Sequence, residues 1–326
     1  MTSILTKTLA ACGLIAVSAS AMADANSVSI YGRVDAAVES IKTAGERTNG
    51  VNNSGSLIGF QGVENLGGGL KAGFILEHSF NIDDGANSDT DSFFNSRSEL
   101  FLGGNFGTVR MGRFLSPSYY AVADTVSLHN ADYGITADAL YAFVGLDTNR
   151  LAYTSPEMNG LTLESSVSFH ERANQNSTDK KAYDLAATYN LGNWAFAAGY
   201  SEHGDDEQYA VRATWSQDAW TVSGYHQRSE VDGYQAHVNR IAAAYTVGAG
   251  ELHANFGQAH GEGQHKAQQW TVGYNHNLSK RTKVYALYSQ VTNKHGAAFG
   301  GEAINGQDFA SNQDRKSVSV GIRHNF

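Results

Sequence analysis

The densest cluster of oxygen-bearing side chains lies at residues 83–91, whose sequence is DDGANSDTD. Carboxylate and amide oxygens are the ligands that Ca²⁺ takes in proteins. A helix–loop–helix calcium site also needs a glycine at its sharp turn and a glutamate at its end, and this stretch has neither at the required positions. We therefore interpret the stretch as a solvated loop and predict no metal site. Weak bridging of divalent cations to anionic lipid headgroups is the open alternative.

The remaining polar motifs do not assemble into a catalytic site. The glycine triplet at 67–69 is not followed by the Lys-Ser/Thr pair of a phosphate-binding loop. The nucleophile motif G-x-S-x-G is absent from the sequence, and His260 and His265 fall in a predicted loop. A lipase-like site would need a nucleophile beside a base and an orienting group. We predict that the chain is not an enzyme and requires no cofactor.

The composition indicates which partners and compartments fit the chain. Its 326 residues carry a formal net charge of −9 and include 35 glycines, 2 prolines and 1 cysteine. The acidic balance argues against a nucleic-acid partner, because nucleic acid requires a basic stripe. A secreted chain with so little cysteine must be stabilised by a large core or by its environment rather than by disulfides.

The amino terminus resembles a secretory signal peptide. Lys7 precedes the apolar run Leu9–Val17, and Ala21-Met22-Ala23 fits a cleavage site with small residues. We predict residues 1–23 to be removed and residues 24–326 to form the mature barrel domain described below. Cleavage would remove the only cysteine and would make the net charge one unit more negative. A lipoprotein cleavage box ending at Cys12 is the alternative, but most of the apolar run lies after that residue.

Period-two alternation recurs along the rest of the chain. In the C-terminal run KSVSVGIRHNF, Val318, Val320 and Ile322 share one parity, and serine, arginine and asparagine take the other. Such alternation is typical of a strand with one apolar and one polar face. We identify sixteen segments of this kind. They begin near Val28, Ser54, Leu70, Ser96, Gly107, Asn149, Gly160, Lys181, Asn193, Gln208, Ala219, Val238, Gly250, Ala267, Thr282 and Lys316.

The connections between these segments alternate in length. Seven are tight and rich in glycine and asparagine, as turns with positive φ require, and tyrosine and tryptophan stand beside several of them. The intervening connections are mostly longer and polar, and we expect loops at 42–53, 82–95 and 294–315 and a longest loop from Pro117 to Thr148. Short turns on one side, long loops on the other and an aromatic girdle are typical of an outer-membrane β-barrel.

A closed membrane barrel explains why the chain ends in mid-strand at Phe326. No segment after residue 23 contains 18 consecutive apolar residues, so we expect no helical span. In hydrocarbon an unpaired backbone group costs several kcal/mol, so the first strand must pair with the last. A soluble β-sandwich is the alternative, but the polar parity here is rich in serine, glycine, threonine and asparagine rather than charge. We predict a sixteen-stranded antiparallel transmembrane β-barrel.

Four stretches of the sequence resemble the general diffusion porins of Gram-negative outer membranes. They are SIYGRVDA near the start, GFQGVENLGGGLKA, FGTVRMGR, and GIRHNF at the end. The resemblance implies a water-filled channel for passive diffusion of small hydrophilic solutes and ions, with the third long loop folded into the lumen. It also implies a homotrimer in the outer membrane, contact with membrane lipid and lipopolysaccharide, and recognition of the C-terminal Phe326 by the barrel-insertion machinery.

The same resemblance implies a constriction with basic residues on the barrel wall facing acids on the third loop. The basic positions are Arg33, Arg97, Arg113 and Arg150, and the acidic channel-lining positions are Asp35, Glu77, Glu99, Asp132 and Asp138. Strict alternation from Val109 and Met111 would direct Arg113 to lipid, so either the strand bends near Gly112 or Arg110 takes the role. The chain departs from the family at Leu57 and Gln61, where relatives often carry basic residues, and it lacks the loop motif PEFGG.

Ion preference stays open at this point. The negative total charge favours cations, whereas four arginines at the waist would favour anions, because charge acts mainly within a Debye length of roughly 8–10 Å. An outer-membrane barrel that acts mainly as an adhesin or surface receptor through its long loops is the alternative function.

Overall fold

The computed structural model describes residues 27–88, 92–124, 126, 140–169, 180–297 and 312–326. The predicted signal peptide at 1–23 lies outside these residues and stays a prediction. Almost every element is a strand. The strands are β1 (Ser27–Thr43), β2 (Glu46–Asn53), β3 (Leu57–Gly67), β4 (Leu70–Ser79), β5 (Arg97–Gly104), β6 (Gly107–Arg113), β7 (Arg150–Thr154), β8 (Leu161–Ser168), β9 (Ala182–Leu191), β10 (Trp194–His203), β11 (Asp206–Gln217), β12 (Trp220–Val231), β13 (Tyr234–Val247), β14 (Gly250–Gly261), β15 (Lys266–Asn277), β16 (Thr282–Lys294) and β17 (Arg315–Asn325). The helix α1 (Pro117–Val122) and the 3₁₀ turn η3 (Glu262–Gln264) are the helical elements among the described residues.

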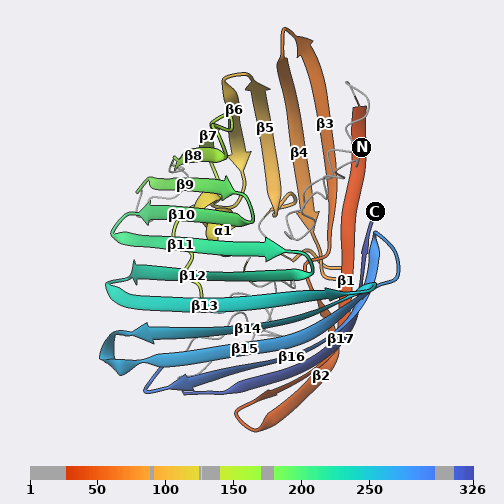
Figure 1. Ribbon diagram of the computed structural model, residues 1–326, viewed down its shortest axis with the longest axis vertical. Helices are drawn as coiled ribbons and strands as arrows, with labels where there is room; N and C mark the ends of the chain where they lie inside the picture. Colours follow the sequence, from red (N-terminus) through yellow and green to blue (C-terminus); the bar gives the residue numbers. More distant parts are fainter. Residues whose placement is uncertain (1–26, 89–91, 125, 127–139, 170–179, 298–311) are drawn as a thin grey trace, which may run out of the picture.

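The strands form one antiparallel sheet that closes on itself, with β17 lying beside β1 (Figure 1). Seventeen strands occupy sixteen positions around the barrel, because β2 pairs with Ala36–Thr43 and β3 with Ser27–Arg33 of the same strand β1. The last residue takes part in closure: Phe326 donates its backbone N–H to the Gly32 carbonyl at 3.0 Å and accepts one from Gly32 at 3.1 Å. The sixteen-stranded barrel and the pairing of first with last are therefore confirmed.

One expected loop is wrong. Residues 42–53 are not an open connection but the end of β1, a two-residue turn and β2. Ala44 and Gly45 both have positive φ, of 50° and 96°, and a turn with two positive φ values joins antiparallel strands tightly. The sequence of β2 is polar, so composition alone indicated a loop. Its backbone is nevertheless paired along β1, from Thr43↔Glu46 to Ala36↔Asn53.

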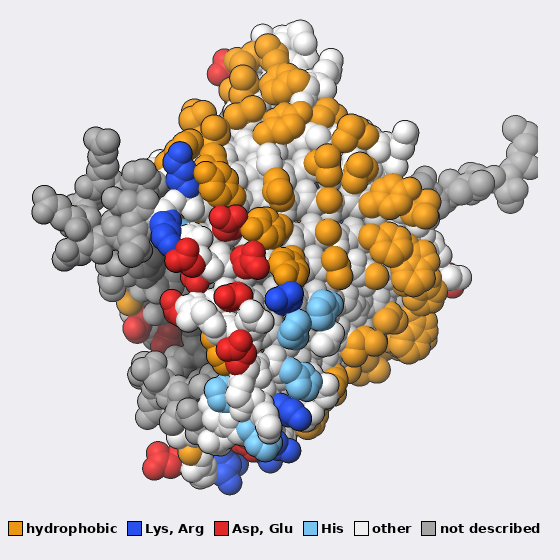
Figure 2. All heavy atoms as spheres, turned by 90° about the vertical axis from the view of Figure 1, so that its left-hand side faces the viewer, with side chains coloured by type: hydrophobic (Ala, Val, Ile, Leu, Met, Phe, Trp, Pro, Cys, Tyr) orange, Lys and Arg blue, Asp and Glu red, His pale blue; other side chains and the backbone are white. Residues whose placement is uncertain are grey.

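Most strands have an apolar face turned outward and a polar face turned inward. On β17, Val318, Val320 and Ile322 are exposed and Ser317 and Ser319 are buried. Figure 2 shows hydrophobic side chains spread widely over the outer surface of the sheet. No helix in the described part of the chain is long and apolar enough to cross a membrane.

The largest apolar cluster lies inside the barrel, where the connection between β6 and β7 packs on the wall. Its loop side chains are Ala121, Val122, Ala123, Val126, Leu140 and Tyr141, and its wall side chains are Ala197, Ala210, Tyr225, Val238, Ala242, Ala259 and Ala267. Most wall members are alanines at inward-facing positions of β10–β15. Small side chains at these positions leave room for a loop between the wall and the centre of the lumen. The described parts of the third loop are therefore folded into the barrel.

Candidate functional site

The start of the third loop is fixed to the wall by the carboxylate of Asp184 on β9. This side chain is buried and accepts hydrogen bonds from the Ser118 backbone N–H at 2.8 Å and the Ser118 hydroxyl at 3.0 Å. The Ser116 hydroxyl, at the N-cap of α1, also donates to it, and the Ser201 hydroxyl donates from β10 at 2.6 Å. A buried carboxylate with several donors is a strong anchor, because charge-assisted hydrogen bonds are about twice as strong as neutral ones.

The return of the loop is held by a second anchor, the amide of Gln227 on β12. Its Nε2 donates to the Ala142 carbonyl at 2.8 Å, and its Oε1 accepts the Ala142 N–H at 2.9 Å. The neighbouring Gln208 accepts a hydrogen bond from the Tyr141 hydroxyl at 3.3 Å and donates to the Ser118 hydroxyl at 3.0 Å. Both ends of the described part of the loop are thus bonded to the same region of the wall, β9–β12.

The predicted basic residues lie on other strands of the inner wall. Arg97 on β5 forms an ion pair with Glu99 at 2.7 Å, and Arg110 on β6 bridges Glu99, at 3.2 Å, and Glu164. Arg33 on β1 is buried and donates from Nε to the Gly55 carbonyl at 2.8 Å. This position follows from its inward parity, as the sequence indicated.

Arg113 reaches the inner side through a bend at Gly112. The φ of Gly112 is +135°, and a Cβ at this position would lie 2.0 Å from the Ser98 carbonyl oxygen. The Arg113 guanidinium donates to the Ser92 hydroxyl at 3.0 Å. The sequence left two possibilities, a bend at Gly112 or a role for Arg110, and the structure contains both.

Arg150 is placed differently from the other arginines. Its side chain is buried under the end of the third loop, where its Nε donates to the Leu146 carbonyl at 3.1 Å and its Nη1 to the Ser166 hydroxyl at 3.3 Å. The Phe114 ring lies 5.6 Å from its guanidinium carbon and 4.3 Å from that of Arg110. These hydrogen bonds join the end of the third loop, at Leu146, to the wall strand β8, at Ser166.

The predicted acids divide into three groups. Asp35 is fully buried, paired with Arg323 and hydrogen-bonded by the Tyr285 hydroxyl at 2.7 Å. Glu77 accepts from the Tyr31 hydroxyl at 2.7 Å, and Glu99 belongs to the arginine pairs. These three therefore lie on the wall and not on the loop. Asp132 and Asp138 fall outside the described residues, so their place opposite the arginines stays a prediction.

Asp147 is the loop acid that the structure places near the basic wall. Its carboxylate lies 3.9 Å from the Arg150 guanidinium, and its side chain is 43% exposed. Partial desolvation raises the pKa of the Asp147 carboxyl, and the positive charges of Arg150 and Arg113 oppose that shift. The carboxylate thus gains a proton at a higher pH than a free aspartate does.

Sequence reasoning missed the residues that dock the loop. Asp184, Gln208 and Gln227 have inward parity, and a buried charge or amide on such a face was the available signal. Their partners lie 66 to 90 residues away, and no local pattern identifies them.

Within the described residues no group of three or more His, Cys, Asp and Glu side chains could hold a metal ion. The acidic stretch at 83–91 is described as far as residue 88.

Comparison with known proteins places the chain in a family. The family described as "Gram-negative porin" matches residues 8–296. Outer membrane porin protein 32 of Delftia acidovorans is 31% identical over 357 residues, which cover 98% of this chain and 99% of the relative. The structure of an anion-selective porin from Comamonas acidovorans superposes with a TM-score of 0.81 at 28% identity, over 92% of this chain and 100% of that one. A trimer form of OmpT from Vibrio cholerae superposes with a TM-score of 0.67 at 14% identity, over 93% and 100%, and supports the fold alone. The chain therefore belongs to the Gram-negative porin family and is an outer-membrane β-barrel channel, not an enzyme.

Proposed function

We propose that this porin passes small hydrophilic solutes with a preference for anions, selected between the docked third loop and the basic wall. The observation that carries the proposal is the position of the loop. It is bonded to β9–β12, and Arg33, Arg97, Arg110 and Arg113 lie on β1, β5 and β6. The loop occupies the lumen beside one wall, and solutes pass beside the other.

The charge balance inside the lumen differs from that of the whole chain. The inward-facing basic residues of the strands are Arg33, Lys71, Arg97, Arg110, Arg150, Arg212, Arg240, Lys283, Arg315 and Arg323, with Arg113 at the bend. The inward-facing acids of the strands are Asp35, Glu39, Glu46, Glu77, Glu99, Glu164, Asp184, Asp206 and Glu251. The basic set is the larger, although the chain carries a net charge of −9. Because screening limits charges to about 8–10 Å, the local set decides which ions enter.

The mechanism is passive selection by a transverse field. Arginines on one wall and carboxylates on the loop, for which we propose Asp132, Asp138 and Asp147, would orient polar solutes across a narrow passage. Apolar solutes gain nothing from this field and must displace ordered water. Anions gain from the arginines that are not fully neutralised by Glu99 and Glu164. The anion selectivity named for the related Comamonas acidovorans porin supports this preference, although it was stated for that protein.

Liposome swelling tests the proposal directly. Mature protein is reconstituted into liposomes, and entry rates are compared for solutes of matched size that carry a carboxylate, no charge or an ammonium group. We expect the carboxylate solute to enter fastest and the ammonium solute slowest. The reverse order would contradict the anion preference while leaving the channel itself established.

The proposal also covers the oligomeric state of the porin and its insertion into the outer membrane. We propose a homotrimer of separate pores, surrounded by outer-membrane lipid and lipopolysaccharide, and recognition of the last strand by the barrel-insertion machinery. The Phe326 side chain is 43% exposed at the end of the barrel that carries the tight turns, and its ring covers Gly32. An aromatic ring presented in this way is accessible to a partner before closure. Closure of single channels in three equal steps would support the trimer.

A further inference from the structure

A connected set of five aromatic rings runs from the inner wall onto the third loop. Tyr119 of α1 lies 5.7 Å from Tyr141 and 4.7 Å from Phe143, measured between ring centroids. Tyr141 lies 5.7 Å from Tyr225 of β12, and Tyr120 continues the set at 5.8 Å from Tyr119. These separations are typical of favourable tilted and edge-to-face contacts between rings. We call the five rings the aromatic array.

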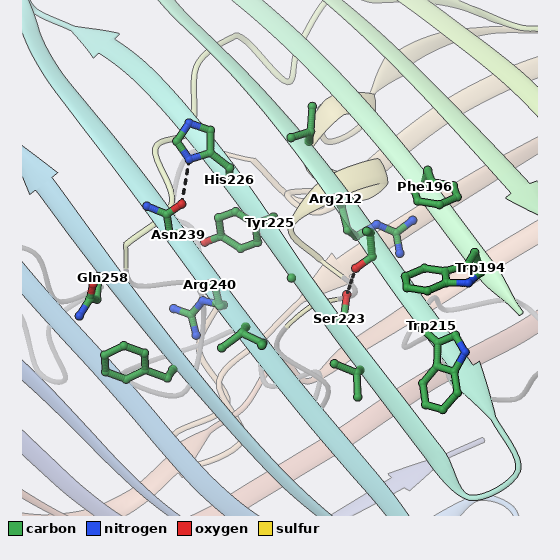
Figure 3. A pocket seen from close by; sticks show the side chains of 16 residues that line it. Trp194, Phe196, Arg212, Trp215, Ser223, Tyr225, His226, Asn239, Arg240 and Gln258 are labelled. Atoms are coloured by element: carbon green, nitrogen blue, oxygen red, sulfur yellow. Dashed lines mark hydrogen bonds between the residues drawn. The ribbon is translucent and has the colours of Figure 1, made fainter.

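The aromatic array is buried at the wall and exposed at its other end. Tyr225 is 4% exposed and stands between its register partners Arg212 and Arg240 on the neighbouring strands (Figure 3). Tyr120 and Phe143, on the loop, are 41% and 59% exposed. Because the wall covers one side of the docked loop, we infer that the exposed rings are turned towards the passage on the other side.

Docking of the loop explains the buried rings but not the exposed ones. The loop is held beside Phe143 through its backbone, since the Gln227 amide bonds both the N–H and the carbonyl of Ala142. The Phe143 ring rests on Tyr119 and Tyr141, and more than half of it remains uncovered. Grouped apolar side chains that stay exposed mark binding surfaces, and aromatic side chains are common in ligand sites. The exposed rings are therefore suited to a solute with a flat apolar face.

An arginine of the basic wall accompanies the exposed end of the aromatic array. Tyr120 lies close enough to the Arg97 guanidinium to interact with it electrostatically. Arg97 keeps 26% of its side chain exposed, and it shares the Glu99 carboxylate with Arg110, at 2.7 and 3.2 Å. A single carboxylate does not fully neutralise two guanidinium groups. The same place in the passage therefore offers aromatic faces and a partly neutralised cation.

We propose that the aromatic array binds small aromatic carboxylates in the passage, with the solute ring on Tyr120 and Phe143 and the carboxylate directed to Arg97. The role of the carboxylate rests on the proposed anion preference, whereas the role of the rings does not. One aromatic contact corresponds to roughly two- to tenfold in affinity. A neutral sugar would cover the rings but leave the charge of Arg97 unused, so an aromatic carboxylate is the better match.

The test measures how three solutes of similar size block the single-channel current in potassium chloride. Benzoate carries a ring and a charge, cyclohexanecarboxylate carries the charge on a saturated ring, and benzamide carries the aromatic ring without the charge. Each solute is titrated against mature protein in a planar bilayer, and an apparent dissociation constant is obtained from the block. We expect benzoate to bind at least threefold more tightly than cyclohexanecarboxylate, and benzamide to bind more weakly than benzoate.

Variants separate the part of the rings from the part of the charge. Phe143→Leu and Tyr120→Leu each keep an apolar side chain but remove an exposed ring, so each should lower the ratio of benzoate to cyclohexanecarboxylate affinity. Their double variant should bring the ratio close to one. Leu115→Ala is the control, because Leu115 is an exposed apolar residue of the same loop without a ring, and it should keep the native ratio. Arg97→Gln should weaken both carboxylates and leave their ratio unchanged.

The outcomes distinguish this site from the proposed function. Equal block by benzoate and cyclohexanecarboxylate in the native channel, or a native ratio in the double variant, would overturn the aromatic site even in an anion-selective channel. A cation-selective channel that keeps the native ratio would contradict the proposed anion preference and leave the role of the rings in place. Tighter binding of methyl glucoside than of benzoate would assign the array to sugars and overturn the proposal. Native-like open-channel noise shows that the loop of a variant is still docked, and the single variants decide where the double variant is noisy.

Discussion

Removing the Asp184 carboxylate should release the third loop and make the channel wider and noisier. In Asp184→Ala the loop loses three hydrogen bonds, from the Ser116 hydroxyl and from the backbone and hydroxyl of Ser118. At about 1.5–3 kcal/mol for each bond to a charged group, docking weakens by roughly 4.5–9 kcal/mol. Because each 1.4 kcal/mol is about tenfold, the undocked population rises by roughly three to six orders of magnitude. The apolar cluster around Val122 and Leu140 still holds part of the loop, so we expect frequent excursions and not a permanently empty lumen.

Single-channel recordings in planar bilayers measure this effect as open-channel noise and mean conductance, both of which should increase. Asp35→Ala is the matched control, because Asp35 is also a buried inward-facing aspartate, and among the described residues its carboxylate bonds to the wall groups Arg323 and Tyr285. This control should lower the temperature at which the barrel unfolds and leave the noise unchanged. Native-like noise and conductance in Asp184→Ala would refute the assignment of Asp184 as the loop anchor.

Three further predictions follow from the wall. Arg97→Ala/Arg113→Ala should shift the anion-to-cation permeability ratio towards cations by about threefold, since two charges at ~6 Å in water-like screening contribute under 1 kcal/mol together; an unchanged reversal potential would count against these residues. Lowering the pH from 7 towards 5 should increase anion preference, because the raised pKa of Asp147 lets this carboxyl lose its negative charge above the usual value of about 4, and Asp147→Asn should reduce the dependence. Gly112→Ala should lower the unfolding temperature seen by heat-dependent gel mobility, because its Cβ would lie 2.0 Å from the Ser98 oxygen at a φ of +135°; native-like heat resistance would contradict the bend.

The barrel was predictable from two physical constraints, the alternation of side chains along each strand and the pairing of every backbone group in hydrocarbon. Alternation along a strand decides which side chains contact lipid. The adjacent residues Ser317 and Val318, for example, face the lumen and the lipid respectively. Closure follows from the need to pair every backbone group in hydrocarbon. The error at 42–53 arose where the strand leaves the apolar band, because there a paired strand can be polar on both faces, as β2 is.

The constriction was predictable only in part. Inward parity and resemblance predicted Arg33 and Arg97 on the inner wall, and their role at a constriction stays a prediction. Strict alternation from Val109 and Met111 indicated that Arg113 would need a bend near Gly112, where φ is +135°. The docking of the loop was not predictable, because it depends on Asp184 and Gln227 meeting residues that are distant in sequence. The burial of Arg150 beneath the loop has the same cause. These contacts need the space left by the small alanine side chains of the wall. The sequence does not show that the third loop packs against those alanines.

The reversal potential of the native channel under a salt gradient tests the central claim most directly. Purified mature protein in a planar bilayer, with concentrated potassium chloride on one side and dilute on the other, reports conductance and ion preference together. A stepwise conductance with a reversal potential of the sign set by chloride is expected, because the inward-facing basic side chains of the strands outnumber their inward-facing acids and arginines line the wall opposite the loop. A potential of the sign set by potassium would contradict the role given to the basic wall.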